Sequence, residues 1–219
     1  MGAPVILLFF TDGKARENEN GRLRKLTAKL SKKHYIHSFV INSESSISEE
    51  RGGARDKREK YINIASEMIR NMQLGENETQ IAFVRYSGLK RTDTVFHFKN
   101  HYNASEAIEE IAKTPTLGGT TQTGAAMLDA SKEFDRRFGG RTTAQKFMIV
   151  FTDAYSQDDP IDASAKLYQE RVKVLAVAVD DAIQPPEHEQ LKSIATDQKS
   201  IFLEKDFHKL FTYFSQCRQ

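Results

Sequence analysis

The sequence has a single cysteine, Cys217, and lacks any apolar run approaching the roughly 20 residues that a membrane-spanning helix requires. One cysteine allows neither an internal disulfide framework nor a zinc site built from cysteines. A net charge of +2, from 32 basic and 30 acidic residues, gives no overall attraction to nucleic acid. With 39% hydrophobic residues, the 219-residue chain is too apolar to be disordered and too polar to be a membrane protein. These absences leave a globular protein of one domain, or of one domain with an appendage.

Six short apolar runs predict the strands of a sheet. Five of them are nearly continuous in aliphatic and aromatic residues, a composition typical of strands that are covered on both faces. These five are Val5–Phe10, Ile36–Ile41, Ile81–Tyr86, Lys146–Phe151 and Val172–Val179. The sixth run, Thr94–Phe98, follows Ile81–Tyr86 closely enough to form a hairpin, and therefore an antiparallel edge strand.

Amphipathic stretches alternate with these runs. Apolar residues recur at the spacing of one helix face over residues 23–30, 62–72, 104–111, 161–168 and 207–214. Strands that alternate with such helices predict an α/β fold: a doubly wound, mostly parallel sheet with one antiparallel edge strand and helices on both faces.

Residue patterns of common enzyme classes are missing. The six histidines have no metal-ligand spacing, no nucleophile and base stand out, and Gly118–Gly124 lacks the lysine of a phosphate-binding loop. Neither Thr-Asp segment, at Asp12 or at Asp153, carries the second aspartate expected of an aspartyl phosphotransferase. The basic stretch 14–33 and the mixed cluster 51–60 are interpreted as solvated helix faces, because no aromatic residues are interleaved with the charges. We therefore expect no enzymatic activity, with a phosphotransferase-like enzyme as a distant alternative.

Three polar segments are predicted where a ligand would bind. Asn42–Ser46 follows one strand, Gly118–Gly124 precedes a helix, and Thr152–Ala154 ends another strand. In an open α/β sheet, ligands bind beyond the carboxyl ends of the strands. A hard cation requires hydroxyl, carboxylate and water oxygens that converge from several loops, and these segments supply the first two kinds.

In these segments, and in the strands next to them, the sequence resembles the von Willebrand factor A (VWA) domain family. The resemblance covers about residues 36–215, in the order usual for the family, and is carried by SFVINSESSISEE, IAFVRYS, LGGTTQTGAAM, FMIVFTDAYSQDD and VKVLAVAVDD. The third run is similar to the Gly-Gly-Thr-x-Thr-Gly segment of the family, and the fourth to its Thr-Asp-Gly strand. The resemblance implies a doubly wound domain that binds proteins, often through a metal-ion-dependent adhesion site.

The same resemblance implies a ligand set for Mg²⁺ or Mn²⁺ at Asn42, Glu44, Ser46, Thr121 and Asp153. Of these, Ser46, Thr121 and Asp153 match the residue types of the family. Asn42 replaces a carboxylate and Glu44 replaces a hydroxyl, so the number of carboxylates stays at two, one of them on a longer arm. A glutamate where a serine fits disturbs the octahedral geometry that magnesium requires. These departures favour a degenerate or metal-free site and leave the intact site as the alternative.

The loops around this site imply a partner-binding face, with contacts from Ser45, Thr120, Gln122 and Tyr155. The implied function is a non-enzymatic, protein-binding module of an adhesion or scaffold protein, whose partner brings an acidic side chain to the site. The alternative is a metal-independent module for assembly within a tandem or oligomeric protein. Neither nucleic acid nor membrane insertion is expected.

Single residues of the set also have local interpretations. Thr121 and Thr123 are suited to cap the helix that follows them, because hydroxyls satisfy the free N–H groups of a first turn. Asp153 is suited to turn the chain at a strand end. Because the motifs occur together and in family order, a shared site is the stronger interpretation.

Residues 1–35 are predicted to be a βα segment separate from the VWA-like domain, residues 36–219. VILLFFTDGKAREN and the basic helix after it resemble the Thr-Asp-Gly strand and next helix of a preceding repeat. The competing interpretation makes Asp12–Arg16 the first loop of this domain, and it is weakened by Lys14 and Arg16, which repel a cation. We expect Val5–Phe10 to pair at a sheet edge of this domain or in a partner chain.

The sequence leaves the compartment open. Met1–Phe10 is interpreted as a strand rather than a signal peptide, because no basic region precedes it and Asp12 follows where a small-residue cleavage site belongs. The chain then stays inside the cell or lacks upstream residues, whereas the resemblance favours an extracellular location. In a secreted parent, Asn77 and Asn103 fit the N-glycosylation pattern and Cys217 is suited to join another chain.

Overall fold

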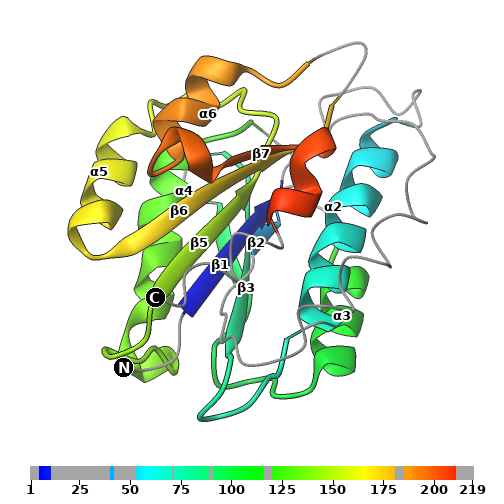
Figure 1. Ribbon diagram of the computed structural model, residues 1–219, viewed down its shortest axis with the longest axis vertical. Helices are drawn as coiled ribbons and strands as arrows, with labels where there is room; N and C mark the ends of the chain where they lie inside the picture. Colours follow the sequence, from blue (N-terminus) through cyan, green and yellow to red (C-terminus); the bar gives the residue numbers. More distant parts are fainter. Residues whose placement is uncertain are drawn as a thin grey trace.

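A computed structural model describes residues 5–10, 40–41, 53–70, 72–88, 91–115, 120–180 and 185–210. Within them lies a sheet in the order β4-β3-β1-β5-β6-β7, with β2 paired to β1 (Figure 1). Every pair of strands is parallel except β3 and β4. The strands are β1 (Val5–Phe10), β2 (Val40–Ile41), β3 (Ile81–Tyr86), β4 (Thr92–Phe96), β5 (Lys146–Phe151), β6 (Val172–Ala178) and β7 (Ile201–Leu203).

Helices cover both faces of the sheet. Figure 1 shows α2 and α3 on one side of it and α4, α5 and α6 on the other. The α-helices are α2 (Gly53–Arg70), α3 (Ala104–Lys113), α4 (Thr123–Ala130), α5 (Ile161–Gln169) and α6 (His188–Ile194). Short 3₁₀ turns are η1 (Ser131–Phe134), η2 (Arg136–Phe138), η3 (Gln198–Ser200) and η4 (Glu204–Asp206). No helix within the described ranges is long and apolar enough to cross a membrane.

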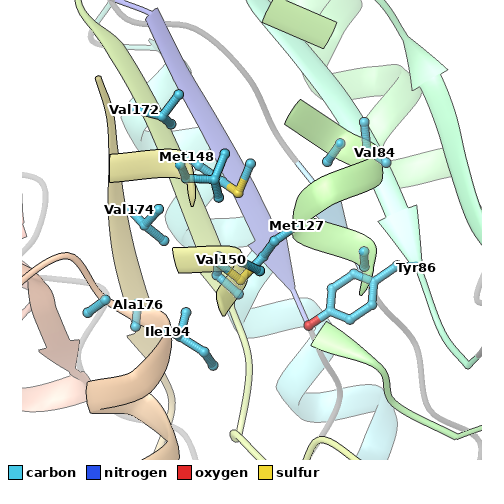
Figure 2. Close-up of a cluster of buried hydrophobic side chains, with 14 of the residues drawn as sticks. Val84, Tyr86, Met127, Met148, Val150, Val172, Val174, Ala176 and Ile194 are labelled. Atoms are coloured by element: carbon cyan, nitrogen blue, oxygen red, sulfur yellow. The ribbon is translucent and has the colours of Figure 1, made fainter. Parts of the chain in front are cut away.

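The strands divide their side chains between two hydrophobic cores, one on each face of the sheet. In β5, Ile149 and Phe151 pack into the core under α2 and α3, whereas Met148 and Val150 pack into the core under α4 and α5. Successive side chains of a strand point to opposite faces, so a strand buried on both sides must be apolar throughout. Figure 2 shows the second core, where Met127 of α4 lies against side chains of the sheet.

These observations confirm the predicted fold class, an α/β fold with one antiparallel edge. Strands β1, β3 and β5 have the predicted bounds, and β6 is one residue shorter than predicted. The hairpin partner β4 begins two residues earlier than predicted, and its pairing with β3 is antiparallel. The predicted helix over residues 23–30 lies outside the described residues.

The expectation that Val5–Phe10 pairs at a sheet edge is wrong. β1 lies inside the sheet, where Leu7 pairs with Ala82 of β3 on one side and with Met148 of β5 on the other. A strand between two neighbours satisfies its backbone donors and acceptors on both sides, which an edge strand leaves open. Of the predicted strand Ile36–Ile41, the described part is β2, which pairs with β1 near its carboxyl end.

Candidate functional site

The predicted site residues within the described ranges gather at one edge of the sheet. Asp153 follows β5 by two residues, and Thr120, Thr121 and Gln122 directly precede α4. The two segments are joined, because the Gln157 N–H donates to the Thr121 carbonyl at 2.9 Å. Four further predicted residues, Asn42, Glu44, Ser45 and Ser46, lie outside the described residues.

Thr121 presents a buried hydroxyl to this edge. Its side chain is 1% exposed, and its Oγ1 has no hydrogen-bond partner within the described part of the chain. The backbone around it is fixed, since the Gln122 N–H donates to the Ser87 carbonyl at the end of β3 at 3.2 Å. Gly88 lies so close that a Cβ there would be 2.5 Å from Thr120 Oγ1. A buried hydroxyl without a partner is rare and indicates a position built for a ligand or for a neighbouring group.

The interpretation of Thr121 and Thr123 as helix caps is wrong. The first turn of α4 is capped from another loop, where Asp158 accepts from the N–H groups of Gly124 and Ala125 at 3.1 and 2.8 Å. A carboxylate at a helix N-terminus also meets the positive end of the helix dipole, which makes it a stronger cap than a hydroxyl. The Thr123 hydroxyl instead meets Tyr86 Oη at 3.1 Å inside the core.

Replacing Asp158 with alanine is expected to lower the free energy of unfolding by about 1–2 kcal/mol, the usual cost of losing a helix cap. Chemical denaturation of both proteins measures the change. Asp162→Ala is the matched control, because Asp162 is an exposed aspartate in the first turn of α5 and its loss should cost under about 0.5 kcal/mol. Equal effects of the two variants would show that Asp158 does not cap α4.

Asp153 is buried, and a lysine lies against it. Lys57, from the first half of α2, places its Nζ 3.4 Å from Asp153 Oδ2, and the two residues are 1% and 4% exposed. Burial raises the pKa of the Asp153 carboxyl above its usual value, and the Lys57 ammonium and the N–H of Tyr155 offset only part of that effect. The Asp153 carboxyl and the Lys57 ammonium therefore lie within ion-pair distance of each other inside the protein.

The interpretation of Asp153 as a residue that turns the chain at the end of a strand agrees with the structure. The Tyr155 N–H donates to Asp153 Oδ1 at 3.4 Å across a turn in which Ala154 has a φ of 68°. This left-handed conformation favours glycine, and alanine adopts it at a cost of about 1–2 kcal/mol. The loop is held in place on its far side, where the Glu187 N–H donates to the Asp153 carbonyl at 3.0 Å.

The residues predicted to contact a partner surround this edge. Thr120 and Tyr155 are exposed and Gln122 is half-buried. The ring of Tyr155 is held by its hydroxyl, which donates to the Pro185 carbonyl at 2.7 Å. An aromatic side chain that is exposed yet fixed is suited to contact a protein, because little conformational entropy is lost on binding.

The described residues do not fit a divalent cation. Thr121 Oγ1 is a free hydroxyl oxygen, but the Asp153 carboxylate already faces an ammonium group, which repels a second cation. Within the described ranges, no group of three or more histidine, cysteine, aspartate or glutamate side chains is placed to hold a metal ion. The Lys57 ammonium already offsets the charge of the Asp153 carboxylate, without a metal ion.

Sequence reasoning missed Lys57, Asp158 and Ser156. Lys57 was assigned to a solvated cluster, and this is wrong: α2 packs on the sheet and buries the side chain. Its neighbour Arg58 is half-buried and donates from Nη2 to the Thr114 carbonyl at the end of α3, at 2.5 Å. Ser156 holds the two loops together, since the Thr123 N–H donates to its Oγ at 2.7 Å. No local pattern marks these residues, because each acts on a segment distant in the sequence.

Comparison with known proteins agrees with this fold. A family model described as the von Willebrand factor type A domain matches residues 47–216. The collagen alpha-1(XII) chain of Notophthalmus viridescens is 30% identical over 142 residues, which are 64% of this chain and 15% of that protein. The human collagen alpha-5(VI) chain is 27% identical over 172 residues, which are 78% of this chain and 6% of that protein. The chain thus spans a small part of the relatives it matches.

Two solved structures are similar in fold. Manganese-loaded TRAP protein of Plasmodium vivax has a TM-score of 0.65 at 18% identity, over 81% of this chain and 71% of that one. Proximal thread matrix protein 1 of the mussel byssus, with a zinc-occupied MIDAS motif, has a TM-score of 0.60 at 17% identity. That match covers 97% of this chain and 66% of the mussel protein.

Proposed function

Because the chain belongs to the von Willebrand factor type A family, we propose that it is a non-enzymatic, protein-binding module of an adhesion or scaffold protein. The observation that carries the proposal is the edge of the sheet at β5 and α4. There the exposed Tyr155 and Thr120 stand on loops that are tied together and to the sheet by backbone hydrogen bonds. A rigid surface of this kind binds a partner without first having to be ordered.

The contact surface comprises Thr120, Gln122 and Tyr155, together with Ser45 of the loop outside the described residues. A partner with an acidic side chain is the one that the family resemblance implies. The metal-independent form of this binding is favoured by the ion pair of Lys57 with Asp153, in which the ammonium offsets the charge of the Asp153 carboxylate. Binding through Mg²⁺ or Mn²⁺, as in the manganese-loaded neighbour, is the less favoured form.

A second candidate function is assembly within a tandem or oligomeric protein. In this candidate, residues 1–35 derive from a preceding repeat and contribute β1 to the sheet of the module that residues 36–219 form. The presence of related domains in long collagen chains supports this candidate. The same relatives support an extracellular location.

Tyr155→Ala is expected to weaken partner binding about tenfold or more, because rigid, partly exposed aromatic residues are frequent hot spots. Surface plasmon resonance of the full chain over immobilised collagen VI and collagen XII measures the change. Tyr168→Ala is the control: Tyr168 is 67% exposed on α5, away from the proposed face, and its removal should leave the affinity unchanged. An affinity that is unchanged in Tyr155→Ala, or that falls equally in Tyr155→Ala and Tyr168→Ala, would contradict the proposed surface.

A further inference from the structure

Lys57 is the most unusual charge among the described residues. It is 1% exposed, whereas the next lysine of the same helix, Lys60, has a side chain 22% exposed and pairs with Glu204 at 2.5 Å. Lysine is almost never fully buried unless it is paired, because an ammonium group taken from water loses a large hydration energy. A lysine in this environment must be held by a specific negative group, and Asp153 Oδ2 at 3.4 Å is such a group.

The position of this ammonium decides what else can bind Asp153. A magnesium ion coordinated by Asp153 Oδ2 would sit about 2.1 Å from that oxygen, and therefore within about 5.5 Å of Lys57 Nζ. A single and a double positive charge at that separation, in a site shielded from water, repel each other strongly. The carboxylate can neutralise one of the two cations, and α2 supplies the lysine as part of the fold.

We propose that the Lys57 ammonium takes the place of a divalent metal ion beside Asp153 and prevents metal from binding there. This inference deepens the proposed function, because it makes the binding face independent of metal. The ammonium forms part of the folded chain, so the Asp153 carboxylate is paired with a positive charge before any partner arrives. Removal of divalent ions should then leave the face intact.

Metal titration of the full chain tests the proposal. Five proteins are titrated with MgCl₂ and MnCl₂ by calorimetry, and melted with the same salts or with chelator: wild type, Lys57→Met, Asp153→Asn, Lys57→Met/Asp153→Asn and Lys60→Met. A bound ion raises the melting temperature in a saturable way. The wild type and Lys60→Met are expected to show no saturable binding. Lys57→Met is expected to gain binding at least about tenfold tighter than any in the wild type, and the double variant to lose that gain.

Other results would overturn the proposal. Saturable binding to the wild type that Asp153→Asn abolishes would show that the lysine excludes no metal. A folded Lys57→Met that binds no metal would show that the lysine replaces none. If Lys57→Met is unfolded in chelator, recovery of the folded fraction by Mn²⁺ supports the proposal and its absence overturns it. None of these readouts involves a protein partner, so failure of the proposed function would be detected separately, by the collagen-binding experiment.

Discussion

Lys57→Met, measured in the presence of chelator, should lower the free energy of unfolding by about 3–5 kcal/mol, the cost of removing one partner from a buried ion pair. The methionine keeps most of the volume of the lysine side chain, so the loss arises from the Asp153 carboxylate, which remains buried without the ammonium. Urea denaturation, followed by tyrosine fluorescence and by circular dichroism, gives the free energy of unfolding. The double variant Lys57→Met/Asp153→Asn should recover a large part of the loss, since it removes both charges.

The pH dependence of this variant has a definite sign. Burial raises the pKa of Asp153, so the folded protein binds a proton there more tightly than the unfolded chain does. Protonation therefore favours the folded state as the pH falls from neutral toward the raised pKa. Without the Lys57 ammonium, the pKa of Asp153 rises further. The difference in free energy of unfolding between wild type and Lys57→Met should therefore be largest at neutral pH and become smaller as the pH is lowered.

Lys60→Met provides the control for a lysine of the same helix. Its ion pair with Glu204 is partly exposed, and exposed pairs contribute about 0–1 kcal/mol. A loss of equal size in Lys57→Met and Lys60→Met, or a stability gap independent of pH, would mean that the Lys57 ammonium does not compensate the Asp153 carboxylate.

Leu7→Pro is the second change with a large expected effect, about 2–4 kcal/mol of lost stability from a broken ladder hydrogen bond and an unpaired buried carbonyl. Leu7 pairs with β3 on one side and β5 on the other, and proline removes the backbone donor that one of these ladders uses. A carbonyl of the neighbouring strand is then left buried without a donor, which adds to the cost. Thermal unfolding followed by circular dichroism measures the loss.

Val40→Pro is the matched comparison, because β2 pairs with β1 over two residues only. Its expected cost is about 1 kcal/mol. A larger loss in Val40→Pro than in Leu7→Pro would place the segment ending at Ile41 in the middle of the sheet instead of β1, and would favour the division of the chain at residue 35.

The fold was predictable because its signals are local. Continuous apolar runs such as Lys146–Phe151 and helical spacing such as that of residues 104–111 each need only a short window of sequence. The order of strands is not a local property. Val5–Phe10 is apolar throughout, whereas Ile36–Ile41 contains His37 and Ser38, but both runs predict a strand and composition alone does not decide which one pairs with β3 and β5.

The site was predictable in part for the same reason. Thr121 and Asp153 belong to short motifs, and the structure places both beside the carboxyl edge of the sheet. Lys57 belongs to a cluster of charges that looks like a solvated helix face, and only the packing of α2 onto the sheet reveals that one of its lysines is buried. Asp158 caps a helix that begins 35 residues before it in the sequence, a relation that no capping pattern contains.

The central position of β1 also determines when the molecule can fold. β1 can pair with β3 early, but Val5 also pairs with Lys146, so β1 gains its second neighbour, β5, only after the 140 residues between these two have been synthesised. Contacts between residues so distant in sequence form slowly, because closing the long loop between them costs conformational entropy before the pairing contributes any stability. Until that point an apolar strand is exposed to neighbouring chains, and crowding of nascent chains would favour misassembly. The module is thus expected to fold late and all at once, rather than strand by strand during synthesis.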